Sequence, residues 1–277
     1  MIARFLSLLL GCGLCLAMPL SAGSEWTHTP PQWHYLSHGL IFSEVKVFHR
    51  GEMVETLAVV KADPAFNAFR VFHHKPRSIT AWQEEIKAPV VFNASYYSPE
   101  GRPVGLVVSD GKLFGPLHNQ QMRGMFVAEP VGMSPDLPRA TILDLVFGRV
   151  EPQNLPWTQG VQSFPLLLDY KGRIRVRSTD KRAYRTVICA DRNGNILIFN
   201  TANEYFTLYD FAHFLKASAF EIDSALNLDG GSEAQLYIKT KDFEHFSPPS
   251  WKSRLANLLD QQRFLLPTVI GVFPRQD

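Results

Sequence analysis

The sequence predicts a single α+β domain with mixed, mainly antiparallel sheets and a few interspersed helices. Strand-like apolar segments outnumber helix-like segments along the chain, and the helix-like segments are scattered among them. A length of 277 residues is typical of one good-sized domain once a leader is removed. With 45% hydrophobic and 19% charged residues, the chain can bury a core and does not have the composition of a disordered protein.

The N-terminus has the composition of a secretory signal. Arg4 precedes an apolar stretch at about 5–18, and small residues follow, so 1–22 is expected to be a signal peptide cleaved after Ala22 or Gly23. The apolar stretch is shorter than the ~20 residues that span a bilayer, which makes an uncleaved anchor the less favoured alternative. The protein is therefore expected to be exported, either periplasmic or extracellular, with no stable membrane insertion after cleavage.

Three strands are expected near the start of the mature chain. The segment 23–39 is rich in Pro, His, Trp and Ser without periodicity, and we expect it to be a connecting arm before a domain spanning 40–277. Apolar and β-branched residues then recur between turn residues, which indicates strands. These strands are expected at 39–50, 52–63 and 66–74, the first two joined at Arg50-Gly51.

A helix followed by a buried strand comes next. Thr80 and Gln83 fit a capping box, which predicts a short helix over 81–87. The apolar run 90–92 then predicts a strand that ends at Asn93.

Two hairpins and a second helix complete the expected elements. Asp110-Gly111 and Asn193-Gly194 are typical hairpin turns, and Thr207 with Asp210 predicts a helix cap. The expected elements are a hairpin within 105–115, a hairpin over 186–199, a helix over 208–217, and a strand over 224–237 that Asp229-Gly230-Gly231 interrupts.

The charge balance and the missing motifs narrow the functional classes. A net charge of +2 without a Lys/Arg-rich block does not favour a nucleic-acid partner. The chain lacks a GxSxG nucleophile elbow, a phosphate-binding P-loop and an HExxH zinc motif. No cofactor is predicted, although the sequence leaves a divalent metal open.

Polar residues stand where several apolar segments end. Asn93 and Asp229 follow apolar runs, and Arg182 and Arg185 precede one. Functional sites are often built from loop residues that a rigid sheet holds in place. The alternatives are structural: Asn93 could end its strand through a side-chain turn, and Asp229 with its two glycines could form a hairpin turn.

Six segments together resemble the phosphodiester glycosidase family. The resemblance covers about 57–272, and "NLDGG" is its most specific part. The chain departs from the family at Ala94 and Ser95, where the family often has glycines, and at 231–233, where the family is richer in glycine. The matching segments, in order, are "NASYY", "GRPVGLVVSDGKL", "VQSFPLLLD", "KRAYRTVICADRNGNILIF", "TLYDFAHFL" and "ALNLDGGSEAQLY".

The resemblance implies hydrolysis of a glycosyl-1-phosphodiester or phosphoglycan, releasing a sugar and a phosphate monoester. A carboxylate would stabilise the positive charge that develops on the sugar, attack it, or orient water, and Asp229 is the candidate. Arginines bind phosphate oxygens, so Arg185 is expected to act in catalysis and Arg182 in substrate binding. Asn93 is the third expected catalytic residue. The remaining residues expected to bind substrate are Gly230, Gly231, Ser232 and Asp191.

Two other functions remain open from the sequence. The departures at Ala94 and Ser95 suit an envelope glycan-binding module that has kept the fold and lost turnover. A metal-assisted phosphodiesterase would instead use Asp229, Asp191 and Asn93 as oxygen ligands.

Overall fold

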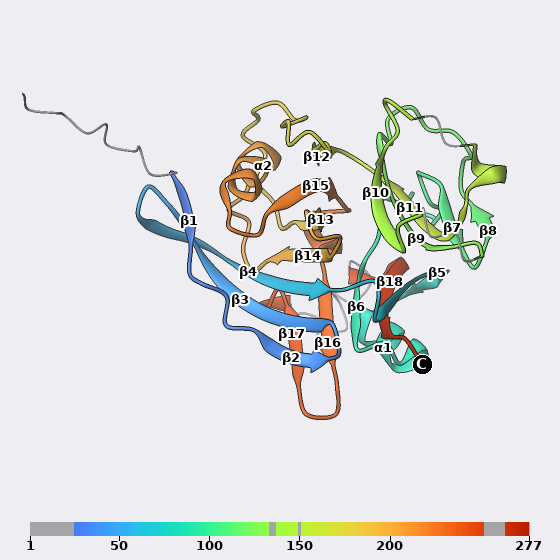
Figure 1. Ribbon diagram of the computed structural model, residues 1–277, viewed down its shortest axis with the longest axis horizontal. Helices are drawn as coiled ribbons and strands as arrows, with labels where there is room; N and C mark the ends of the chain where they lie inside the picture. The colour runs from blue at the N-terminus through green and yellow to red at the C-terminus, as the bar shows by residue number, and fades with distance from the viewer. Residues whose placement is uncertain (1–24, 133–136, 149–150, 252–263, 277) are drawn as a thin grey trace, which may run out of the picture.

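The computed structural model describes residues 25–132, 137–148, 151–251 and 264–276. The expected signal peptide lies outside these residues. In the described part, every pair of hydrogen-bonded strands is antiparallel, and the strands form one eight-stranded and two five-stranded sheets (Figure 1). No helix in this part of the chain has the length and apolar character needed to cross a membrane.

The eight-stranded sheet contains the strands that adjoin Arg185 and Asp229 in the sequence. Its order is β1-β3-β4-β14-β13-β15-β12, with β2 paired to β3. β1 and β2 lie within the segment expected to be a connecting arm, so part of that arm is built into the sheet instead. The strands are β1 (Trp26–His28), β2 (His34–Ser37), β3 (Leu40–His49), β4 (Glu52–Ala62), β12 (Leu166–Leu168), β13 (Thr186–Asp191), β14 (Ile196–Thr201) and β15 (Ile222–Asn227).

The two five-stranded sheets have the orders β10-β9-β11-β7-β8 and β17-β16-β6-β18-β5. The first contains β7 (Val107–Ser109), β8 (Lys112–Phe114), β9 (Gly124–Pro130), β10 (Ala140–Asp144) and β11 (Trp157–Ser163). The second contains β5 (Asn67–Arg77), β6 (Val90–Asn93), β16 (Leu236–Lys239), β17 (Glu244–Ser247) and β18 (Leu266–Pro274).

The expected strand over 224–237 is two strands in different sheets. β15 pairs with β13 in the eight-stranded sheet, whereas β16 pairs with β6 in a five-stranded sheet. Asp229-Gly230-Gly231 is therefore neither a hairpin turn nor an interruption of one strand. It lies on the connection that carries the chain from one sheet to the other.

Two α-helices occur in the described residues, so the α+β class expected from the sequence overstates the helical content of a sheet-rich fold. The first, α1 (Ile79–Ile86), begins earlier than expected because the Ser78 side chain, and not Thr80, accepts the capping hydrogen bond from Ala81 N. The second, α2 (Leu208–Ala217), has the expected Thr207 cap. The short 3-10 helices are η1 (Pro152–Asn154) and η2 (Gly231–Glu233).

The expected turn between β7 and β8 is confirmed. Asp110 and Gly111 have φ values of 47° and 75°, as a primed hairpin turn requires. The turn between β13 and β14 is wider, because the Asp191 carboxylate accepts hydrogen bonds from the backbone N–H groups of Asn193 and Asn195.

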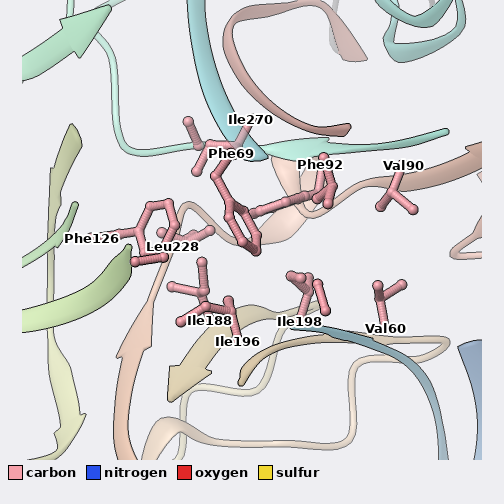
Figure 2. Close-up of a cluster of buried hydrophobic side chains, with 14 of the residues drawn as sticks. Val60, Phe69, Val90, Phe92, Phe126, Ile188, Ile196, Ile198, Leu228 and Ile270 are labelled. Carbon is pink, nitrogen blue, oxygen red and sulfur yellow. The ribbon is translucent and has the colours of Figure 1, made fainter. Parts of the chain in front are cut away.

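The central core lies between the sheets (Figure 2). Val60 and Ile198 of the eight-stranded sheet face Phe92 and Val90 of the second five-stranded sheet, and Phe126 of the first five-stranded sheet closes one end. Each of these side chains is fully buried, which contributes roughly 1.5–3 kcal/mol per side chain.

The other face of the eight-stranded sheet packs against α2. Phe211 and Phe214 of the helix join a second buried cluster with Val59 and Phe199 of the sheet. Strands such as β13 and β14 are therefore covered on both faces, which explains why they are apolar almost throughout and show no alternation.

Candidate active site

Three strand ends bring the predicted site residues together. Asn93 is the last residue of β6, Asp229 lies two residues beyond β15, and Arg185 immediately precedes β13. Because β13 and β15 are antiparallel neighbours, the start of one lies beside the end of the other, and Leu228 N donates to Thr186 O at 2.9 Å. The topology thus joins segments that are far apart in the sequence.

The backbone of Asp229 is fixed on both sides. Its N–H donates to Ala94 O at 3.1 Å, and its carbonyl oxygen accepts from Asn93 Nδ2 at 2.8 Å. The half-buried carboxylate accepts from Gly230 N at 2.9 Å. Burial, with a further contribution from the Glu233 carboxylate, raises the pKa of Asp229 to about 7, although the Gly230 hydrogen bond acts to lower it.

Both the oxygen and the nitrogen of the Asn93 carboxamide are hydrogen-bonded to other protein groups. The residue is 1% exposed, and Asn93 Oδ1 accepts from Thr186 Oγ1 at 2.6 Å and from Gln235 N at 3.1 Å. Its Nδ2 donates to the carbonyl oxygens of Asp229 and Ala94. A carboxamide offers two donors and two acceptor positions, and all four are occupied here. The Asn93 carboxamide therefore holds the Asp229 backbone in place.

Arg185 is a buried cation, and two of its three guanidinium nitrogens donate hydrogen bonds to backbone carbonyl oxygens. It is 6% exposed, its Nη2 donates to Lys181 O at 2.9 Å, and its Nε lies 3.4 Å from Phe206 O. Among the described residues, Nη1 has no hydrogen-bond partner. Burial lowers the pKa of the guanidinium from its usual value, and Tyr96 acts to raise it. Arginine remains charged under such a shift.

The two glycines of the motif are required for different reasons. A Cβ on Gly230 would lie 3.0 Å from Tyr184 O and 3.5 Å from Arg185 Nη1, so the absence of a side chain leaves room beside the guanidinium. Gly231 has a φ of 73°, which favours glycine. Their N–H groups donate to Asp229 Oδ1 and Tyr184 O, respectively.

Glu233 is a second carboxylate at the site, and no sequence motif assigns it a role. It ends η2, and Ser232 Oγ donates to Glu233 Oε2 at 2.9 Å. Its charge contributes to the raised pKa of Asp229. The available signal was its position four residues after Asp229 on a connection rich in glycine. The predicted residue Ser232 thus contacts Glu233.

Tyr96 also belongs to the site and was missed, although it lies in the quoted motif "NASYY". Its hydroxyl donates to Phe164 O and accepts from Asn227 Nδ2, each at 2.8 Å. Burial and the nearby Asp229 carboxylate raise the pKa of Tyr96, whereas Arg185 acts to lower it. The Tyr96 phenol therefore lies close enough to Asp229 and Arg185 for both charges to act on its pKa, and it stays protonated at neutral pH.

Two of the residues predicted to bind substrate, Asp191 and Arg182, make no described contact with Asp229. Asp191 lies at the opposite end of β13 from Arg185, where its carboxylate forms an ion pair with Lys61 at 3.0 Å and holds the β13–β14 turn. The exposed Arg182 places its guanidinium 4.5 Å from the centre of the Tyr205 ring. We call Asn93, Tyr96, Arg185, Asp229 and Glu233 the Asp229 cluster. Among the described residues, no hydrogen bond or ion pair links Arg182 to this cluster.

A cavity of about 750 Å³ is lined by residues that include Met122, Arg123, Val146 and Gln162. It does not include Asp229. Among the residues that the structure describes, the Asp229 cluster is the better candidate for chemistry, because it combines a carboxylate of raised pKa with a buried arginine, and both charges act on Tyr96. No group of three or more His, Cys, Asp or Glu residues in the described ranges is arranged to hold a metal ion.

Comparisons with known proteins agree with this architecture. The catalytic domain of zebrafish N-acetylglucosamine-1-phosphodiester alpha-N-acetylglucosaminidase, auto-inhibited by its pro-peptide, is similar with a TM-score of 0.59 and 18% identity, covering 91% of this chain and 89% of that chain. A hypothetical protein from Synechocystis is similar with a TM-score of 0.55 and 16% identity, covering 89% and 64%. These likenesses show a shared fold. A comparison with curated protein sequences finds no match.

The family assignment comes from the sequence itself. A family model described as phosphodiester glycosidase matches residues 87–273, which is more than half of the 277 residues. The matched range contains Asn93, Arg185 and Asp229. The chain therefore belongs to the phosphodiester glycosidase family.

Proposed function

We propose that the protein is an exported hydrolase that cleaves the sugar–oxygen bond of a glycosyl-1-phosphodiester and releases a free sugar and a phosphate monoester. The observation that carries this proposal is that Gly230, the residue after Asp229, lies beside Arg185 Nη1, while the Asp229 and Arg185 charges both act on Tyr96. Family membership supports the reaction class.

Arg185 binds the phosphate. Its Nε and Nη2 face backbone carbonyl oxygens, which holds the guanidinium plane still, and Nη1 is available to a phosphate oxygen. Gly230 leaves the space that this oxygen needs, since a Cβ there would lie 3.5 Å from Nη1. A buried cation attracts an anion strongly because the surrounding dielectric is low.

Asp229 acts on the anomeric carbon or on the water that attacks it. Departure of the phosphate leaves positive charge on the sugar, which a carboxylate stabilises. The departing phosphate monoester has a second pKa near ~6 and needs little protonation, so the site can work without a strong general acid. With a pKa of about 7, Asp229 can accept a proton from water and release it near neutral pH.

Three other residues set up this chemistry. Asn93 positions Asp229 by holding its carbonyl oxygen, and Glu233 keeps the pKa of Asp229 raised. Tyr96, fixed by Phe164 O and Asn227 Nδ2, presents a neutral phenol beside both charges.

The departures from the family at Ala94 and Ser95 are compatible with turnover. Neither residue has a positive φ, so the backbone there does not require glycine. Ala94 is 1% exposed and packs in the central core, while its carbonyl oxygen accepts the Asp229 N–H. The added methyl group therefore fills core space next to the cluster.

Hydrolysis in ¹⁸O-labelled water tests the proposal directly. A panel of sugar-1-phosphodiesters is incubated with the protein, and the products are analysed by mass spectrometry. Carbon–oxygen cleavage places the label in the free sugar and leaves the phosphate monoester unlabelled. Label in the phosphate would identify a phosphodiesterase instead, and binding without any product would identify a glycan-binding module. The Asp229→Asn variant is the matched inactive control.

A further inference from the structure

Four large side chains are exposed on neighbouring loops at one edge of the molecule. Phe147 is 65% exposed, Tyr170 57%, Val146 48% and Phe164 43%. Val146 and Phe147 follow β10, Phe164 lies between β11 and β12, and Tyr170 follows β12. Large apolar side chains gathered at one place on a surface mark an interaction site more often than scattered ones do.

Cations are interleaved with these side chains. The guanidinium groups of Arg173 and Arg175 lie 5.9 and 5.3 Å from the centre of the Phe147 ring, and Lys171 Nζ lies 5.3 Å from the centre of the Tyr170 ring. Arg123 joins Val146, Phe164 and Arg175 around a hollow of about 60 Å³. We call this set the basic–aromatic patch; its members are Arg123, Val146, Phe147, Phe164, Tyr170, Lys171, Arg173 and Arg175.

The patch carries excess positive charge. Two carboxylates pair with it: Asp169 accepts hydrogen bonds from Arg173 and Arg175, and Asp144 accepts one from Arg175. Burial acts to raise the pKa of Asp169, but the arginine hydrogen bonds hold it down to about 2, so this carboxylate stays ionised. Among the described residues, Arg123 and Lys171 take part in no ion pair. Four cations therefore face two carboxylates.

We infer that the basic–aromatic patch docks the protein on the surface of an anionic lipid bilayer. Exposed aromatic rings enter the boundary between headgroups and acyl chains, and neighbouring Lys and Arg side chains bind lipid phosphates.

Docking in this orientation brings the candidate active site close to the bilayer. The carbonyl oxygen of Phe164 accepts the hydrogen bond from the Tyr96 hydroxyl, and Tyr96 lies near Asp229 and Arg185. Phe164, one member of the patch, therefore adjoins the Asp229 cluster. The inference about docking stands on the patch alone and does not depend on the proposed reaction.

Co-sedimentation with vesicles tests the inference. We expect the mature protein to bind phosphatidylglycerol vesicles at least about tenfold more tightly than phosphatidylcholine vesicles, and to be released as salt rises from about 50 to 500 mM. Arg123→Gln and Lys171→Gln should each weaken binding about fivefold. The double variant Phe147→Ala with Tyr170→Ala should abolish most of the remaining binding.

The chain offers matched controls away from the patch. Tyr35 on β2 is 68% exposed, and Arg139 is an exposed arginine that lines a different cavity. Tyr35→Ala and Arg139→Gln should bind like the wild type. No binding by the wild type, equal binding to both lipids, or equal losses in the control and patch variants would each overturn the inference. All of the substituted side chains are exposed, and near-UV circular dichroism verifies that every variant is folded.

Discussion

The Asn93 carboxamide donates a 2.8 Å hydrogen bond to the carbonyl oxygen of Asp229, a residue 136 positions further along the chain. This contact ties the end of β6 to the connection between β15 and β16, so it links two sheets at the point where the candidate catalytic carboxylate stands. The same carboxamide accepts from Thr186 and Gln235, which belong to the other walls of the site.

Replacing Asn93 with alanine should cost stability and activity together. The variant leaves the Asp229 carbonyl oxygen, the Thr186 hydroxyl and the Gln235 N–H without their partner, at about 1–3 kcal/mol for each buried group. Urea unfolding should show a fall of at least about 2 kcal/mol, and kcat should fall because Asp229 is no longer held. Asn193→Ala, at an exposed position in the β13–β14 turn, is the control and should change neither quantity.

Replacing Asp229 with asparagine should separate activity from stability. We expect kcat to fall by about a thousandfold or more while the protein stays folded, because the substitution removes a charge and keeps the shape. Retained turnover in this variant would remove Asp229 from the mechanism.

The pH dependence of stability should change in the same variant. The pKa of Asp229 is raised from 3.8 to about 7, so the folded protein binds a proton that the unfolded chain releases. The stabilisation from this proton is complete below pH ~4 and is lost as pH rises through about 7. Relative to the wild type, Asp229→Asn should therefore gain stability between about pH 4 and 8, by roughly 1–4 kcal/mol, as measured by urea unfolding across pH.

The Glu233 carboxylate should tune the pH profile of activity. If Asp229 works as a base, kcat rises with pH through its pKa of about 7. Glu233→Gln removes the nearby negative charge and lowers that pKa, so the rising limb should move to lower pH. An unmoved limb would show that the titrating group is not Asp229. Glu221→Gln, at an exposed position before β15, provides the charge-matched control.

Substitutions of Arg185 and Arg182 should have very different effects on KM. Arg185→Lys keeps a charge but cannot hold the Phe206 and Lys181 carbonyl oxygens and a phosphate at once, so KM should rise about 10–100-fold. Arg182→Ala removes an exposed side chain that lies over Tyr205 and should change KM less than about threefold. A larger rise in KM for Arg182→Ala than for Arg185→Lys would assign the phosphate-binding role to Arg182.

Much of the fold follows from local sequence patterns. The Asp110-Gly111 turn, the Thr207 cap and the apolar run before Asn93 all specify their own backbone, and each is confirmed. The cap of α1 was misplaced because Ser78 and Thr80 are both good capping residues, and only the structure distinguishes them.

The site was less accessible from the sequence, because its contacts are long-range. A strand end can be recognised locally, so Asn93, Arg185 and Asp229 were found. The sequence does not reveal which groups a carboxamide will meet, so the hydrogen bonds of Asn93 with Asp229, Thr186 and Gln235 could not be predicted. Asp191 resembled a site carboxylate, but the antiparallel order of β13 places it at the far end of the strand.

Glycine positions 230 and 231 should respond differently to alanine. At Gly231 the backbone has a φ of 73°, so alanine costs about 1 kcal/mol of stability through strain and should leave KM nearly unchanged.

At Gly230 the backbone is extended, with a φ of −118°, so any residue can adopt it. The added Cβ would instead meet Tyr184 O at 3.0 Å and crowd Arg185 Nη1 at 3.5 Å. We therefore expect Gly230→Ala to raise KM about tenfold or more by closing the space for a phosphate oxygen, a larger effect than its loss of thermal stability suggests. Measuring KM and melting temperature for both variants distinguishes the two causes: parallel losses in the two variants would mean that Gly230 serves the backbone alone, and the phosphate would then have to bind elsewhere.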